Sequence, residues 1–170
     1  MRGVTLIEML VATVILVILS AAFVQLFVVG NACSKYITTT SDMADDGNAG
    51  MFGFPGLNGF LPKTWMAQNV VGVSASTLTL NITATPYQFY LSGNQLILKN
   101  LFDGKTSTVA DSVQSVAFKY YGMDTSTYTF AEMTDTSLIS TVTLDLEIQS
   151  SDKKRTLPLS ATVTMRNFGG

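Results

Sequence analysis

This sequence contains no histidine and a single cysteine, Cys33. A Ser-His-Asp triad, a Cys-His pair and a zinc site of histidine and cysteine are therefore excluded. One cysteine also excludes an intramolecular disulfide, and we expect Cys33 to be a small buried hydrophobic residue. Composition alone leaves a Ser-Lys pair possible, but no serine and lysine are marked out for one. We predict that the chain is not an enzyme and needs no cofactor or metal.

Charge is also scarce, because only 13% of the residues are charged and the formal net charge is -2. A nucleic-acid interface needs clustered lysine and arginine. The one basic run, Lys153-Lys154-Arg155, falls in an expected turn, so no nucleic-acid partner is evident. The acidic clusters lack the alternating oxygen ligands of a calcium loop, and we interpret them as solvated turns. They comprise Asp42, Asp45, Asp46, Asp103 and Asp124.

The longest apolar run is residues 9–29, MLVATVILVILSAAFVQLFVV, and it carries no charge. At 1.5 Å per residue, a helix of this length measures about 30 Å, enough to cross the hydrocarbon core of a bilayer. No proline precedes Pro55, so nothing in this run removes a backbone hydrogen bond. The run is apolar on every face of a helix, which is typical of a segment in lipid or inside a helical assembly. We predict that residues 9–29 are transmembrane.

Two charged residues precede the run, Arg2 and Glu8. A carboxylate at the mouth of a membrane helix costs at least a few kcal/mol unless it is paired or stays at the interface, so Glu8 is a candidate functional residue. An ordinary secretory signal would place small residues for cleavage after the apolar run. No convincing site of that kind follows residue 29. The simplest alternative is an uncleaved single-pass anchor.

The residues from Gly3 to Ala12, Gly-Val-Thr-Leu-Ile-Glu-Met-Leu-Val-Ala, resemble the class III leader of type IV pilins and type II secretion pseudopilins. The resemblance implies that residues 1–3 are a leader and that a prepilin peptidase cuts between Gly3 and Val4. It also implies an N-methylated Val4, and for Glu8 the filament-assembly role of the family's fifth-position glutamate. Many members of the family have a proline midway through the run, which this chain lacks.

The same resemblance implies the partners and the location. The partners are other pilin or pseudopilin subunits, the prepilin peptidase, the inner-membrane assembly platform and, before assembly, membrane lipid. The chain would be a single-pass protein of the inner (cytoplasmic) membrane and then part of a periplasmic or extracellular filament.

We predict that the helix containing the apolar run extends past it, so that one helix spans residues 4–46 and stops at Gly47. Residues 47–76 begin with the glycine-rich segment GNAGMFGFPGLNGFLP. A phosphate-binding loop would need a preceding strand, a following helix and usually a lysine at fixed spacing. We interpret the segment as a connector that packs four aromatic residues onto the long helix: Phe52, Phe54, Phe60 and Trp65.

From Thr77 the apolar residues recur with a period of two, which predicts strands. Residues 87–91 and 95–99 form an expected hairpin, and residues 113–121 another strand. The clearest pair is 142–149 and 157–165, joined by a turn at 150–154. We predict that residues 77–170 form a globular domain, an antiparallel sheet with one face buried on the far half of the helix. The predicted fold class is therefore α+β, a long N-terminal helix on a small antiparallel sheet, and the resemblance of residues 3–12 implies that this is the type IV pilin fold.

A second resemblance concerns the C-terminal part. Residues 109–121, followed by two long strands that end Val163-Thr164-Met165-Arg166-Asn167, resemble W-type minor pilins and J-type minor pseudopilins. This resemblance favours a minor subunit of a type IV pilus or type II secretion pseudopilus, in the tip or initiation complex. Two alternatives stay open: a major pilin that repeats along the filament, and a membrane-anchored binding module.

Overall fold

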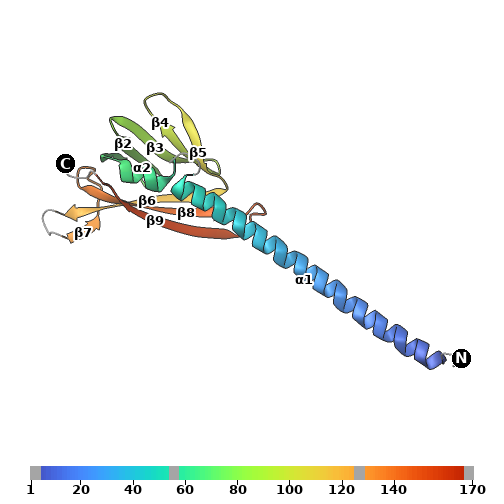
Figure 1. Cartoon of the computed structure of the whole chain (residues 1–170). Coiled ribbons are helices and arrows are strands. Elements are labelled where there is room, and N and C mark those ends of the chain that lie inside the picture. The colour runs from blue at the N-terminus through green and yellow to red at the C-terminus, as the bar shows by residue number, and fades with distance from the viewer. Residues whose placement is uncertain (1–4, 54–57, 125–128, 167–170) are drawn as a thin grey trace. The chain divides into compact units, whose positions relative to one another are not determined.

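The computed structural model of the chain describes residues 5–53, 58–124 and 129–166. The chain divides into two compact units, residues 1–40 and residues 41–170. The first helix, α1 (Leu6–Phe52), begins in the first unit and ends in the second (Figure 1). All described residues of the first unit except Thr5 are helical. The helix is continuous, as the absence of proline predicts.

Among its described residues, the second unit adds a short helix and nine strands to the end of α1. They are α2 (Phe60–Met66), β1 (Asn69–Val73), β2 (Thr77–Ile82), β3 (Thr85–Ser92), β4 (Gln95–Asn100), β5 (Thr106–Ala110), β6 (Val113–Asp124), β7 (Thr129–Glu132), β8 (Ile139–Gln149) and β9 (Thr156–Thr164).

The strands form two antiparallel sheets, one of five strands in the order β1-β2-β3-β4-β5 and one of four in the order β7-β6-β8-β9. The two hairpins expected from the alternating pattern, β3–β4 and β8–β9, are confirmed. The predicted fold class, a long N-terminal helix with antiparallel sheet structure, is confirmed. The expected single sheet was wrong, because the strands form two sheets, and the expected start at Thr77 was wrong, because β1 begins at Asn69. A single sheet with one buried face would leave much of this apolar pattern exposed, whereas two sheets bury their inner faces on each other.

The aromatic residues of the expected connector have different roles. Segment 47–76 holds the end of α1, all of α2 and the first strand, so it is not an irregular connector. Phe60 is fully buried between the sheets, with its ring centroid 6.2 Å from that of Phe89 and 6.3 Å from that of Phe118. Phe52 and Trp65 are half-exposed. Phe54 lies outside the described residues.

The helix ends five residues after the predicted stop at Gly47. Its end is at Phe52, and Gly53 follows with φ +68°, a conformation that favours glycine. Gly47 and Gly50 are buried instead. A Cβ atom on Gly50 would lie 3.0 Å from the Cβ of Ala110, and one on Gly47 would collide with the side chain of Leu159. These two glycines therefore let the helix approach the sheet closely. The expected burial of Cys33 was also wrong, since this residue is exposed on α1.

A buried tyrosine joins the two sheets. The hydroxyl of Tyr120, on β6, lies 2.8 Å from the carbonyl oxygens of both Ser74 and Thr77, to which it can donate. It accepts a hydrogen bond of 3.2 Å from the backbone N–H of Ser74. Ser74 lies in the β1–β2 connection of the other sheet, and Thr77 is the first residue of β2. Burial raises the pKa of Tyr120 to about 12.

We expect the change Tyr120→Phe to lower the free energy of unfolding by about 0.5–1.5 kcal/mol, because it removes the hydrogen bonds of the Tyr120 hydroxyl to the backbone of Ser74 and Thr77. The pH dependence should change as well. The unfolded chain loses this proton near pH 10, before the folded chain does, so stability falls as the pH rises from about 10 to 12. The Tyr120→Phe protein should lack this part of the alkaline loss.

The measurement is denaturant unfolding of the full chain in detergent, at neutral and at alkaline pH. A suitable control is Tyr90→Phe, because Tyr90, on β3, is only partly buried. An equal alkaline loss in the Tyr120→Phe and unmodified proteins would contradict this account.

Candidate functional site

The first turn of α1 is capped by the side chains of Thr5 and Glu8. Backbone bonds of 3.1 and 3.2 Å run from the N–H groups of Glu8 and Met9 to the carbonyl oxygen of Thr5. The N–H and hydroxyl groups of Thr5 donate to Oε2 of Glu8 at 2.8 and 2.9 Å. The N–H of Glu8 donates in return to the hydroxyl of Thr5 at 3.4 Å. Reciprocal bonds of this kind form a capping box, which satisfies donors at a helix start.

The capping box holds the Glu8 carboxylate in one place while leaving it accessible. Oε2 accepts both bonds from Thr5, and Oε1 makes no hydrogen bond to the residues that the structure describes. The side chain is exposed. The pattern Thr-x-x-Glu was visible in Thr5-Leu6-Ile7-Glu8, but our sequence reading assigned Glu8 only to filament assembly and missed its local partner. Of the other predicted site residues, Gly3 and Val4 lie outside the described residues.

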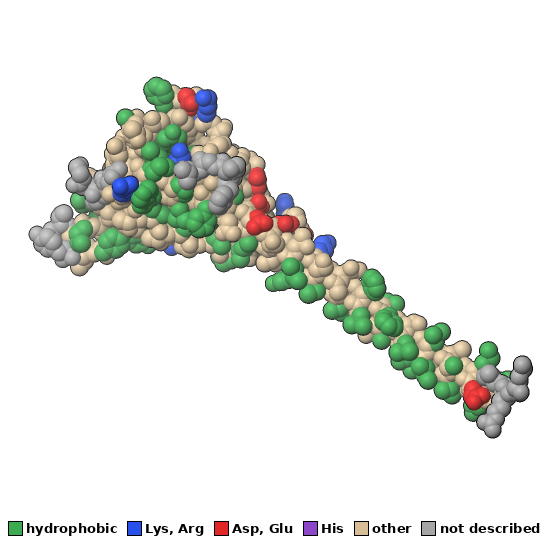
Figure 2. Space-filling view, viewed as in Figure 1, with side chains coloured by type: hydrophobic (Ala, Val, Ile, Leu, Met, Phe, Trp, Pro, Cys, Tyr) green, Lys and Arg blue, Asp and Glu red, His purple; other side chains and the backbone are tan. Residues whose placement is uncertain are grey.

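The helix surface next to this cap is apolar and uncovered. Within residues 6–29 the large apolar side chains are each at least half exposed, from 50% for Val11 to 84% for Leu6. Figure 2 shows such side chains along the length of the helix. By length and composition, α1 could cross a membrane, and it is the one helix among the described residues that could. Burying this surface in lipid or among other apolar helices would be strongly favourable.

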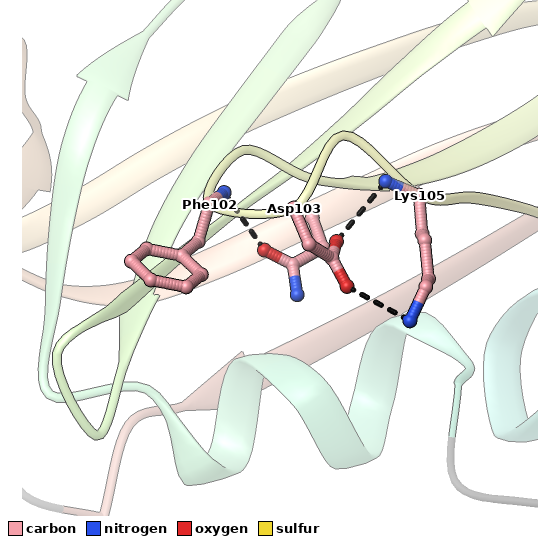
Figure 3. Close-up of polar contacts among 4 residues, drawn as sticks. Phe102, Asp103 and Lys105 are labelled. Carbon is pink, nitrogen blue, oxygen red and sulfur yellow. Dashed lines mark hydrogen bonds and ion pairs between the residues drawn. The ribbon is translucent and has the colours of Figure 1, made fainter.

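Among the described residues, the acidic side chains do not assemble a metal site. Within residues 5–53, 58–124 and 129–166, no group of three or more histidine, cysteine, aspartate and glutamate side chains could hold a metal ion. Asp103 instead bonds within its own turn, accepting from the N–H of Lys105 at 3.0 Å (Figure 3). Asp46 is partly buried, and this burial raises the pKa of its carboxyl group.

These features define a class of protein. A long apolar N-terminal helix whose last turns pack on antiparallel sheets is an α+β fold of the pilin-like type. The family model described as the prokaryotic N-terminal methylation motif matches residues 1–24. This match supports a class III prepilin leader, and with it a pilin-like or pseudopilin-like precursor. Comparisons with proteins of known function and with solved structures give no match.

The matched motif and the helix together indicate how such a precursor is handled. A leader of this type indicates processing by a prepilin peptidase and assembly with other pilin subunits. The exposed apolar helix fits anchoring in a membrane before assembly into a filament. The motif is that of a family of structural subunits.

Proposed function

We propose that this chain is a minor structural subunit of a type IV pilus or type II secretion pseudopilus. In this proposal, the peptidase cuts between Gly3 and Val4, and the new amino group of Val4 is methylated. Before assembly the subunit is a single-pass protein of the inner membrane. It is then incorporated into a filament in the periplasm or outside the cell. The observation that carries the proposal is the methylation motif over residues 1–24, in register with an apolar and uncovered helix.

Assembly requires no chemistry beyond processing, because the helix exchanges one apolar environment for another. In the membrane its exposed side chains contact lipid, and in the filament they contact the helices of neighbouring subunits. Little hydrophobic free energy separates the two states, since lipid tails are as apolar as leucine. The order and stagger of subunits must therefore come from close packing and from polar contacts.

Glu8 is suited to supply such a polar contact. The capping box fixes its Oε2 at the start of α1 and leaves Oε1 open to a partner. A positively charged amino group at Val4 of a neighbouring subunit would complete the pair. Because charges in a low-dielectric bundle interact strongly, each subunit would be drawn to one stagger relative to its neighbour.

Two features favour a minor subunit over a major one. The first is the resemblance of residues 113–167 to minor pilins and pseudopilins. The second is the outer face of the four-stranded sheet, where Thr143 and Thr162 pair across β8 and β9 at 2.9 Å. The same face carries Ser160, which donates to Asp145, and the ion pair between Lys119 and Asp145 at 2.7 Å. A mixed polar face of this kind suits contact with unlike neighbours. In pseudopilus tips of this family, the outermost subunit lacks the fifth-position glutamate. This chain retains Glu8, which places it just beneath the tip in our proposal.

We therefore expect few copies of this chain per filament. The measurement is quantitative mass spectrometry of sheared filaments, with the most abundant subunit as the internal reference. A minor subunit should be present at a small fraction of that reference. A copy number equal to that of the main filament subunit would exclude the minor role and favour the major pilin.

The competing function from another class is a membrane-anchored binding module that never enters a filament. Such a module would need no leader cleavage, so its membrane form would retain Met1. The intact mass of the chain extracted from membranes separates the two possibilities. A mature mass that begins at a methylated Val4 supports the subunit, and a full-length mass contradicts it.

A further inference from the structure

One side-chain amide, that of Gln25, interrupts the apolar part of α1. Within residues 9–29 three side chains are polar: Thr13, Ser20 and Gln25. The hydroxyl groups of Thr13 and Ser20 each donate at 2.8 Å to a backbone carbonyl oxygen one turn earlier in the helix. Both therefore place their protons within their own helix. Gln25 is exposed, and its amide makes no hydrogen bond to any residue that the structure describes.

Lipid cannot satisfy this amide. A side-chain amide has two N–H donors and an oxygen acceptor, and hydrocarbon offers a partner to none of them. A polar side chain near a membrane surface can reach outward to water. Long side chains on a helix lean toward its N-terminus, however, so we expect the amide of Gln25 to lie over Ala21 and Ala22. That level is about 10 Å inside the end of the apolar run, at 1.5 Å per residue. The amide is therefore directed away from the nearer surface.

The helix face around Gln25 allows another helix to approach closely. The side chains one turn before Gln25 on this face are the alanines Ala21 and Ala22. Small residues let two helix backbones come together, and side-chain amides then hydrogen-bond from one helix to the other. The bulky rings of Phe23 and Phe27 stand two residues on either side of Gln25. Two residues correspond to about 200° of rotation, so both rings lie on the opposite face.

A second copy of this chain would be a poor partner for this amide. If Glu8 pairs with the amino group at Val4 of a neighbour, the two helices are displaced by about four residues, or about 6 Å. The Gln25 amides of two such copies would lie about 6 Å apart along the axis, roughly twice the length of a hydrogen bond. The next polar side chain, Ser20, has already donated its proton within its own helix. It could accept from the amide of Gln25 but could not donate to its oxygen.

We propose that the amide of Gln25 hydrogen-bonds to a polar side chain on the N-terminal helix of an unlike subunit. The partner side chain both donates and accepts, as an asparagine or glutamine does. A neighbour whose helix is entirely apolar at this level would leave the amide buried and unpaired, which disfavours that neighbour. The inference rests on the proposed filament function and deepens it. Glu8 sets the stagger between helices, and Gln25 selects which subunit stands beside this one.

The change Gln25→Leu in the full chain tests the need for this hydrogen bond. Leucine is similar in size and favours the helix, so the variant should be cut and membrane-bound as usual. We expect its incorporation into filaments to fall about threefold to twentyfold, the range measured for hydrogen bonds between membrane helices. The matched control is Ser20→Ala, which removes a polar side chain already bonded within its own helix and should incorporate normally. Normal incorporation of Gln25→Leu, or an equal loss in both variants, would overturn the proposal.

The identity of the partner is tested with the photoreactive residue benzoyl-phenylalanine at position 29, one turn beyond Gln25 on the same face. Irradiated filaments should yield a cross-link to the N-terminal helix of a different subunit, in a peptide that contains an asparagine or glutamine. The same probe at position 27, on the opposite face, should not link to that peptide. A link to a second copy of this chain, a link to a peptide without such a residue, or no link in normally assembled filaments would overturn the proposal. These results leave the filament function standing, whereas an uncut leader or the absence of the unmodified chain from filaments would contradict that function itself.

Discussion

Replacing Gly3 by leucine is expected to abolish processing of the chain. Glycine has no Cβ atom, so the backbone at this position can be approached closely by a peptidase, and a bulky side chain would block that approach. The uncut chain would keep residues 1–3 and would have no free amino group at Val4 to be methylated. It should remain in the membrane and fail to enter filaments. Mass spectrometry of the N-terminal peptide measures the cut directly.

The control for this experiment is Gly30→Leu. Gly30 also precedes the strands in the sequence, and a Cβ atom there would meet nothing within 4 Å. This variant should be cut and methylated normally. In the proposed topology, Arg2 would keep this end in the cytoplasm by the positive-inside rule. An N-terminal peptide from assembled filaments that still begins at Met1 would disprove processing between Gly3 and Val4.

The second large effect is expected at Glu8. The Glu8→Ala and Glu8→Gln chains should remain membrane-bound and cleavable, yet enter filaments poorly. In a low-dielectric bundle, either change leaves the neighbouring amino group as an unpaired buried charge, at a cost of about 3–5 kcal/mol. Incorporation should therefore fall at least about a hundredfold. The measurement compares the amount of each variant in sheared filaments with the amount in the membrane.

The capping box allows the charge of Glu8 to be separated from its local role. A glutamine at position 8 can still accept hydrogen bonds from Thr5, because Glu and Gln serve equally in a capping box. The change Thr5→Ala removes the hydroxyl partner but keeps the charge, and should cost the helix only about 1 kcal/mol. We expect Glu8→Gln to be as defective as Glu8→Ala, and Thr5→Ala to be nearly normal. If Glu8→Gln assembles normally, the charge is unimportant and Glu8 serves the helix end alone.

Much of the candidate site could be predicted because its signals are local. The leader, Glu8 and the apolar run follow one another in the chain. They are recognised from their spacing relative to one another and from the absence of charge in the run. The capping box was equally local and could have been found from Thr5 and Glu8. The β8–β9 hairpin was predictable for the same reason, since its two alternating segments flank a short turn.

Predictions failed where a residue's role depends on a distant segment. From the local sequence, Gly47 is expected to end the helix. The residue that requires a glycine there is instead Leu159, which is more than a hundred residues away in the chain. Phe60 reads as part of a connector, yet it fills the space between Phe89 and Phe118. A local sequence pattern does not show which distant segment packs against a residue in the folded chain.

The sequence by itself determined that this chain has a long apolar helix behind a class III leader, and that strands follow it. Helical periodicity, strand periodicity and the absence of charge are properties of short segments. They can therefore be recognised without knowing how the rest of the chain folds. Only the tertiary structure decided that the strands divide into two sheets and that Gly47 and Gly50 seat the helix on them. It also decided that Phe102 is left exposed while Phe60 is buried. Burial is set by which strands pair and which faces meet, and those choices depend on packing across the whole unit.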